Sequence, residues 1–315
     1  MPKKNKEELT LEEKKQRLHV LMNEKNREYK DMVLKFAKDE EEVTRTPFGV
    51  KEIDSLTGGI PSKRFTILWG GESTGKTTLS YMLIANAQKN KKLCAYIDLE
   101  RSWDATRAKQ FGVDVDNLVL ANAFETAEEA MDVFIEMCRN KVVDFIVLDS
   151  IQGLSPKGEQ ETKKGKLKSM EDDEMALLAR KMSKFFRVSA SGVYKGDVTV
   201  VLIGQSRMDI GGFIPLESLS GGKALKFWAT MILRMNRGPK AESPTEKIVL
   251  EELDENGKKI KVEKTIGFQS VIRLQKVKIS GTMVEGSETR LPFFFETGFN
   301  MEKKNEEKTN SKETN

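Results

Sequence analysis

The sequence has few of the residues that bind structural metals or perform thiol and imidazole chemistry. It contains two cysteines, Cys94 and Cys138, and one histidine, His19. Both cysteines lie in apolar stretches, where a reduced, buried thiol is the ordinary interpretation. So few ligands exclude a structural zinc site and a Cys/His catalytic pair. Any hydrolysis must therefore use carboxylates and a bound cation.

Long apolar runs and a strong net charge are also lacking. No run of about 18 or more apolar residues occurs, and the first residues have no apolar centre of the kind found in signal peptides. The net charge of +4 is too small by itself to indicate nucleic acid binding. With 38% hydrophobic and 32% charged residues, the composition is that of a soluble globular protein. We therefore expect a cytoplasmic protein.

Short apolar runs alternate with amphipathic stretches through the middle of the chain. The runs FTILW, CAYID, DFIVLDS and VTVVLIG are typical of buried strands. Helices are predicted from about residue 76, over 104–111, over 127–139 and over 173–189. Wholly apolar strands separated by helices indicate a mostly parallel sheet that is covered on both faces. The predicted fold class is therefore α/β.

The segments on either side differ from this core. Residues 11–38 predict one long charged helix, so residues 1–45 are interpreted as an N-terminal arm and linker. Past Trp228, the runs ATMILRM, EKIVLEE, KKIKVEK, SVIRLQKVKI and LPFFFE predict antiparallel strands that extend the sheet, with a hairpin turn at 254–257. The core is then residues 46–300, and the polar residues 301–315 are predicted to be disordered.

The strongest local signal is the segment GGESTGKTT, which matches the phosphate-binding pattern G-x-x-x-x-G-K-[ST]. It follows the run FTILW and opens a predicted helix, as the motif requires. Backbone N–H groups of such a loop converge on an anion, and the helix N-terminus adds partial positive charge. Lys76 would reach the β- and γ-phosphates of ATP. The predicted nucleotide-binding residues here are Gly70, Gly71, Glu72, Ser73, Thr74, Gly75, Lys76, Thr77 and Thr78.

Carboxylates at strand ends supply candidates for the rest of an ATPase site. Asp149 ends the run DFIVLD and is predicted to bind Mg²⁺ together with the Thr77 hydroxyl. Asp98 and Glu100 follow the run CAYI, and alternation places both on one face of the strand. Either could orient a water molecule. Glu100 lies beyond the apolar part of the strand and is the better placed.

Six segments resemble the RecA family of DNA recombinases. GGESTGKTT, YIDLERSWD, FIVLDSIQGLSPKGE, LLARKMSKFFR, LIGQSRMDIG and SGGKALKFWA occur in the family's order with nearly its spacing, from about Thr46 to Ile279. Phosphate-loop motifs are shared with many NTPases, whereas the last two segments are specific to this branch. The resemblance implies a RecA-like P-loop ATPase core. It also implies an ATP-dependent recombinase that forms filaments on single-stranded DNA and pairs it with homologous duplex DNA.

The resemblance assigns roles to individual positions. It implies that Glu100 is the catalytic glutamate that activates water, and that Gln205 senses the γ-phosphate. Asp104 and Arg107 fall where the family contacts adenine, although bacterial members usually have an aromatic residue where Arg107 stands. An arginine could stack there as a planar cation.

Two lysines match the family's contacts with the nucleotide of a neighbouring subunit. Lys276 and Lys278 are spaced two apart on one strand face. By the resemblance, each supplies positive charge at the transferring phosphate, and ATP lies at a subunit interface of a helical filament. Solvent-facing strand lysines are the alternative interpretation.

Two segments fit the DNA-binding loops of the family. The first covers about 157–172 and is rich in lysine; the second covers 206–222 and is rich in glycine. Between them, basic residues at helical spacing form a stripe that is either a solvated face or a set of phosphate contacts. Such contacts would be independent of sequence and sensitive to salt, with apolar residues wedged between bases. The predicted DNA-binding residues are Arg180, Arg187, Arg207, Phe213, Ile214, Gly221 and Gly222.

The chain departs from the family in its outer segments. Members usually carry a further globular domain after the core that captures duplex DNA, whereas here a charge-balanced tail follows, as in a compact member of bacteriophage type. The helix at 11–38 would, by resemblance, pack on the next subunit, and alone it could equally be a coiled-coil arm.

Two alternative functions remain open from the sequence. One is a hexameric helicase built on the same core, and the other is a non-hydrolysing, ATP-switched recombination mediator. Single-strand-binding or loader proteins are the further partners implied.

Overall fold

The computed structural model describes residues 9–151, 153, 175–209, 216–219, 223–253, 259–279 and 284–299. The chain forms two compact units, Met1–Val43 and Thr44–Asn315. The predictions for residues 157–172 and 301–315 therefore concern segments outside the described residues. In the described part of the chain, no helix has both the length and the apolar character needed to span a membrane.

The first unit contains one long helix, α1 (Leu11–Glu28). Its first turn is closed by a capping box, in which Thr10 accepts from the Glu13 N–H and the Glu13 carboxylate accepts from the Thr10 N–H. The helix ends at Glu28, so the prediction of a helix over 11–38 was too long. Lys30 adopts a positive φ of 50°, and the side chain of Asn26 makes two hydrogen bonds to the backbone of Leu34, which turns the chain back.

The second unit is built on one large sheet with the order β13-β12-β9-β3-β7-β6-β4-β5 and with β8 paired to β7. The run from β9 to β5 is parallel, and β12 and β13 add antiparallel strands. These strands are β3 (Phe65–Gly70), β4 (Cys94–Asp98), β5 (Leu118–Ala121), β6 (Phe145–Asp149), β7 (Thr199–Asp209), β8 (Leu216–Leu219), β9 (Met231–Arg237), β12 (Gly267–Val277) and β13 (Glu288–Phe294).

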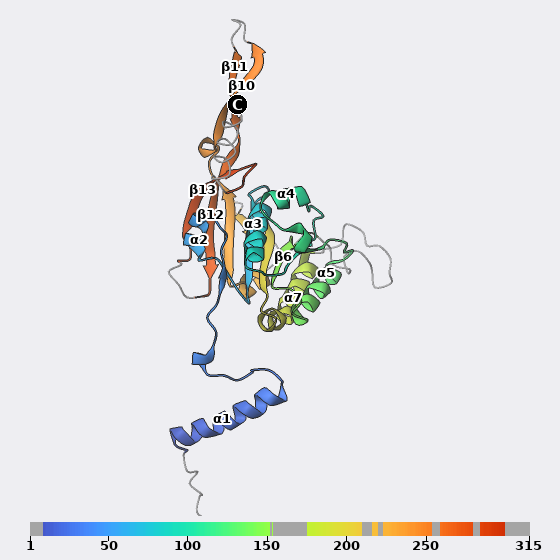
Figure 1. The fold of residues 1–315 in the computed structure, drawn as a ribbon, viewed down its shortest axis with the longest axis vertical. Helices are drawn as coiled ribbons and strands as arrows, with labels where there is room; N and C mark the ends of the chain where they lie inside the picture. The colour runs from blue at the N-terminus through green and yellow to red at the C-terminus, as the bar shows by residue number, and fades with distance from the viewer. Residues whose placement is uncertain are drawn as a thin grey trace, which may run out of the picture. The chain divides into compact units, whose positions relative to one another are not determined.

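Helices cover both faces of this sheet (Figure 1). Residues of α2 (Lys51–Thr57), α3 (Lys76–Lys89) and α4 (Ala105–Gln110) belong to one apolar core. Residues of α5 (Ala127–Arg139), α7 (Met175–Lys195) and α8 (Lys223–Trp228) belong to the other, where α5 and α7 lie side by side. The wholly buried strands β3, β4 and β6 lie between the two cores. The predicted α/β fold with a doubly covered sheet is therefore confirmed.

Parallel strands end at one edge of the sheet, and the polar residues that end them meet there. The register pairs Asp98 with Asp149 and Gly70 with Gln205. Residues far apart in sequence are thus held on neighbouring strands. This edge is where the predicted ATPase residues collect.

Several predicted elements need correction. β9 was predicted to be antiparallel but runs parallel to β3. β10 (Thr245–Leu253) and β11 (Lys259–Thr265) do not extend the large sheet and form a two-stranded sheet of their own, as do β1 (Arg45–Thr46) and β2 (Ile60–Pro61). The segment 206–222, predicted to be irregular, includes the end of β7 and all of β8. The short elements α2, β5 and α8 were not predicted, because each has too few residues to show a period.

Candidate nucleotide site

The phosphate-binding loop connects β3 to α3 and depends on two glycines. A Cβ on Gly70 would collide with the carbonyl oxygen of Met235 on the neighbouring strand. Gly75 precedes α3 with a φ of +91°, and a Cβ there would lie 2.9 Å from the ring of Phe293. The loop therefore passes too close to its neighbours for any other residue at these positions.

Lys76 opens α3 and turns back over this loop. Its side chain is 8% exposed, and Nζ donates to the carbonyl oxygens of Gly70, at 3.1 Å, and Gly71, at 2.6 Å. Burial lowers the pKa of the ammonium, while nearby carboxylates, first Asp149 and then Glu100, oppose that shift. The cation is thus held at the loop backbone, beside a set of acidic groups.

Asp149 lies at the end of β6 and is 2% exposed. Its Oδ2 accepts from the Thr77 hydroxyl at 3.0 Å and from the Tyr96 hydroxyl at 2.6 Å. Burial is the largest cause of the rise in the pKa of Asp149 to about 6. The two predicted metal ligands are therefore adjacent, and Tyr96 beside them was not predicted from the sequence.

The donor set fits magnesium. A hydroxyl and a carboxylate are hard oxygen ligands, and Mg²⁺ in nucleotide sites usually takes one or two protein oxygens together with phosphates and water. Among the described residues, no group of three or more His, Cys, Asp and Glu side chains could hold a metal ion by itself. An ion at Thr77 and Asp149 would therefore need the nucleotide to complete its coordination.

Glu100 and Gln205 lie together although they are 105 residues apart. Gln205 Nε2 donates to Glu100 Oε1 at 2.7 Å. Asp98, the other candidate, instead accepts from the backbone N–H groups of Glu100, at 3.2 Å, and Trp103, at 2.8 Å. Asp98 therefore shapes the turn after β4, and the exposed carboxylate of that turn belongs to Glu100.

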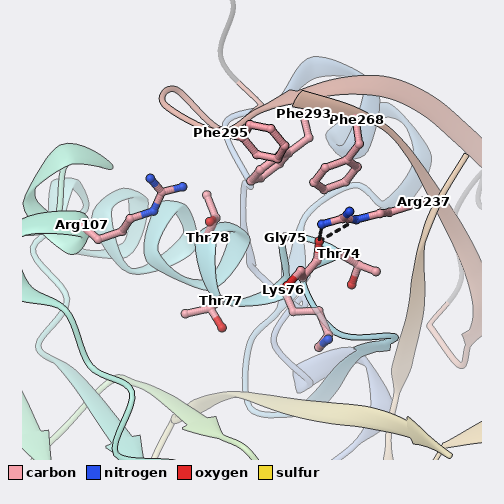
Figure 2. Close-up of a pocket in the computed structure, with 11 residues that line it drawn as sticks. Thr74, Gly75, Lys76, Thr77, Thr78, Arg107, Arg237, Phe268, Phe293 and Phe295 are labelled. Carbon is pink, nitrogen blue, oxygen red and sulfur yellow. Dashed lines mark hydrogen bonds between the residues drawn. The ribbon is translucent and has the colours of Figure 1, made fainter. Parts of the chain in front are cut away.

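A pocket of about 330 Å³ opens beside the loop (Figure 2). One side carries Arg107 of α4, and aromatic rings from β12 and the end of β13 form the roof. Asp104, predicted to contact adenine, caps α4 by accepting from the Arg107 N–H at 3.0 Å. The residues that line the pocket are Ser73, Thr74, Gly75, Lys76, Thr77, Thr78, Arg107, Arg237, Phe268, Phe293 and Phe295.

Arg237 supports the loop from β9. Its Nε and Nη2 donate to the carbonyl oxygen of Ser73 at 3.0 and 2.7 Å, as the dashed lines in Figure 2 show. The guanidinium lies 4.5 Å from the ring centre of Phe268, which stacks on Phe293 with centres 4.6 Å apart. Sequence reasoning missed Phe293 because the run LPFFFE was interpreted only as a strand. It missed Arg237 and Phe268 because no motif surrounds them.

A second network joins β8 to the other side of the loop. Glu217 pairs with Arg234, whose guanidinium lies 5.1 Å from the centre of the Trp69 ring. Hydrogen bonds, first from Ser206 and then from Arg234, lower the pKa of Glu217. A Cβ built on Gly71 would lie 3.7 Å from the Glu217 carboxylate. The base of the predicted second DNA loop therefore lies beside the phosphate-binding loop.

Lys276 and Lys278 do not line the pocket of their own chain within the described residues. Both ammonium groups donate to carbonyl oxygens at the end of α8. Lys276 bonds to Lys226 and to Phe227, the latter at 3.4 Å, and Lys278 bonds to Phe227 at 2.7 Å. Burial, followed by repulsion from Lys278, lowers the pKa of Lys276.

The predicted DNA-binding residues are only partly described. Arg180 and Arg187 are exposed on α7, while Met182 and Phe186 of the same helix are buried. Arg207 lies in β7, where its backbone is paired with Ser218 of β8. The remaining predicted DNA contacts lie outside the described residues: Phe213, Ile214, Gly221 and Gly222.

Comparison with known proteins finds a matching family model and several similar sequences. Residues 16–285 match the model of the RecA N-terminal domain. Protein RecA of Nautilia profundicola is 39% identical over 204 residues, which cover 64% of this chain and 56% of that protein. Protein RecA of Nitratiruptor sp. is 41% identical over 182 residues, covering 57% and 51%. The chain thus spans about half the length of these relatives.

A solved structure shares the fold. The crystal structure of the RadB recombinase superposes with a TM-score of 0.53 over 80% of this chain and 97% of that chain. Its sequence identity is 19%, so this likeness concerns the fold alone.

Proposed function

This chain belongs to the RecA family, and from that premise we propose that it is an ATP-dependent DNA recombinase. It would bind ATP with Mg²⁺, form filaments on single-stranded DNA, hydrolyse ATP when bound to DNA, and pair the strand with homologous duplex DNA. Similarity to the RecA proteins named above supports the general role. The finer steps rest on the site described above.

The observation that carries the proposal is the meeting of four groups at one edge of the sheet. The ammonium of Lys76 and the hydroxyl of Thr77 begin α3, the carboxylate of Asp149 accepts from Thr77, and Glu100 is held by Gln205. Phosphoryl transfer requires a loop that binds the phosphates, a pair of hard oxygen ligands for magnesium, and an exposed carboxylate that can orient water. Binding without hydrolysis would not need the last of these.

The pocket offers a place for each part of ATP. The phosphates would lie against the backbone N–H groups of the loop and beside Lys76. Thr77 and Asp149 would hold magnesium, and the ion would supply positive charge that favours transfer of the terminal phosphate. Arg107 and Phe295 both line the pocket beyond the loop, and a planar cation and an aromatic ring are suited to stack on adenine.

Hydrolysis would use Glu100 to orient and activate water, with Gln205 reporting the state of the terminal phosphate. Gln205 lies in β7, which pairs with β8, so the same strand leads directly into the predicted second DNA loop. This continuity supports a role for Gln205 in coupling nucleotide state to DNA binding.

Lys276 and Lys278 would act on the nucleotide of the next subunit. Both are held in the same place by the carbonyl oxygens that end α8, and neither lines the pocket of its own chain within the described residues. A cation that is ordered but remote from its own site is suited to a neighbour's site in a filament.

Substitution of Lys76 by Ala tests the enzymatic part. ATP hydrolysis in the presence of single-stranded DNA should fall to background, because the phosphates lose the cation that the loop holds. Lys89→Ala, an exposed lysine at the other end of the same helix, is the matched control and should hydrolyse ATP normally. Normal DNA-stimulated hydrolysis by the Lys76 variant would contradict the proposal.

Electron microscopy with ATP and single-stranded DNA tests the assembly. Extended filaments are expected. Closed rings that unwind duplex DNA would instead identify a helicase. Filaments without turnover at saturating DNA would identify an ATP-operated switch.

A further inference from the structure

Tyr96 carries a buried hydroxyl beside the carboxylate that is expected to bind magnesium. It lies in β4, is fully buried, and donates to Asp149 Oδ2 at 2.6 Å. Asp149 is itself only 2% exposed, so water has little access to replace this hydrogen bond. A phenol is a hydrogen-bond donor at neutral pH, which suits it to an ionised carboxylate.

Two hydroxyl groups among the described residues donate to the Asp149 side chain, and magnesium would affect these two hydrogen bonds differently. Both Thr77 and Tyr96 donate to Oδ2. Thr77 is itself an expected magnesium ligand, so its hydroxyl has a second task once the nucleotide is bound. Tyr96 is not an expected ligand and can keep its hydrogen bond to Asp149 throughout.

Ring packing fixes the position of the Tyr96 hydroxyl. The Tyr96 ring lies 5.7 Å from the ring of Tyr81 on α3 and 5.0 Å from the ring of Trp103, measured between ring centres. Tyr81 and Trp103 also contact one another at 5.3 Å. The phenol is therefore held against two other rings and cannot turn away from Asp149 without repacking the core.

We propose that Tyr96 is a positioning residue that fixes the orientation of the Asp149 carboxylate for the magnesium–nucleotide complex. The inference rests on the proposed function, because it concerns the same ATP site. Groups that orient a metal ligand without touching the metal commonly change metal affinity by about 10- to 100-fold when they are removed. A hydroxyl that only satisfied a buried carboxylate would affect stability and leave this affinity unchanged.

The test is Tyr96→Phe, which removes the hydroxyl and keeps the ring. ADP binding to the full chain is measured by calorimetry, once with excess Mg²⁺ and once with EDTA. In the wild type, Mg²⁺ should strengthen ADP binding. In the variant, affinity in EDTA should stay within twofold of wild type, while the strengthening by Mg²⁺ should fall by about tenfold. The Mg²⁺ concentration at half-saturation should rise accordingly.

Trp103→Phe is the matched control, because it alters the same ring cluster and leaves the Tyr96 hydroxyl and Asp149 in place, and its Mg²⁺ dependence should equal that of wild type. If both variants lose the strengthening by Mg²⁺ equally, Tyr96 has a packing role and the inference is overturned. The same holds if Tyr96→Phe loses as much ADP affinity in EDTA as it does with Mg²⁺. An unchanged Mg²⁺ dependence in Tyr96→Phe would also overturn it. If the wild type itself shows no Mg²⁺-dependent ADP binding, the proposed function fails instead.

Discussion

At the scale of single residues, Arg237 shows how a distant side chain can support a motif. Its guanidinium makes two hydrogen bonds to the carbonyl oxygen of Ser73, a residue with a positive φ of 52° inside the phosphate-binding loop. Phe268 packs against that guanidinium. The loop conformation is therefore held from β9 as well as by its own glycines.

Arg237→Met should weaken ATP binding more than it slows the chemical step. Loss of a charged donor pair at a partly exposed site corresponds to roughly 1 kcal/mol, so KM for ATP should rise about fivefold. The rate at saturating ATP should change less than twofold. Steady-state kinetics measure both values. Arg273→Met, an exposed arginine of β12, is the control, and an equal change in KM there would remove the role given to Arg237.

The sequence could predict some of these residues and not others. Lys76, Thr77 and Gly75 belong to a contiguous pattern whose chemistry is set by local geometry, so spacing alone identified them. Arg237 reaches Ser73 across 164 positions of sequence. Nothing local distinguishes it from any other arginine near a strand end, because its role arises only when β9 pairs with β3.

At the scale of secondary structure elements, the β7–β8 pair connects the nucleotide site to the predicted second DNA loop. Gln205 and Ser206 lie in β7, and Glu217 lies in β8. The Glu217–Arg234 pair fastens β8 to β9 beside the phosphate-binding loop. Movement of β8 would therefore require this pair to break or to follow the movement.

Glu217→Gln should reduce the stimulation of ATP hydrolysis by DNA. The substitution keeps the shape of the side chain but removes the charge that holds Arg234, and a partly exposed pair of this kind contributes up to about 1 kcal/mol. The ratio of DNA-stimulated to unstimulated hydrolysis should fall severalfold. Ser218→Ala, the next residue along β8, is the control. A ratio equal to that of wild type in Glu217→Gln would show that β8 does not transmit the signal.

Most elements of the core were predictable, because wholly apolar runs typical of buried strands alternate with amphipathic stretches typical of helices. The direction of β9 was not, since an apolar run such as ATMILRM reads alike in a parallel and an antiparallel strand. β5 was missed because it has only four residues with mixed burial. The end of α1 was missed because the side-chain contacts of Asn26 to Leu34, rather than propensity, stop the helix.

At the scale of the whole molecule, the large sheet separates two apolar cores and brings the predicted ATPase residues together at one edge. The exposed arginines of α7 lie on the face of that helix away from its buried residues Met182 and Phe186. A basic surface of this kind would bind the phosphate backbone without reading sequence. Homology would then be tested by base pairing between the strands.

Replacing Arg180 and Arg187 together with Ala should weaken binding of single-stranded DNA equally for all sequences. Two lost phosphate contacts should also reduce the slope of log affinity against log salt by about 1.4, at about 0.7 for each contact. Binding isotherms at several salt concentrations measure this slope. The exposed lysines Lys109 and Lys141, replaced together by Ala, serve as control. An equal change in that pair would point to net charge rather than to a specific surface.

Both cysteines of the chain are fully buried, and burial raises the pKa of each thiol to about 12. Native thiols are therefore shielded from reagents that attack thiolates. A cysteine introduced at the exposed end of α3, for example Lys89→Cys, would be the single accessible attachment point for a maleimide dye. Such a dye would lie at the end of the helix away from the phosphate-binding loop, so the labelled protein could be used to test the proposed filament assembly on a microscope slide while retaining its pocket.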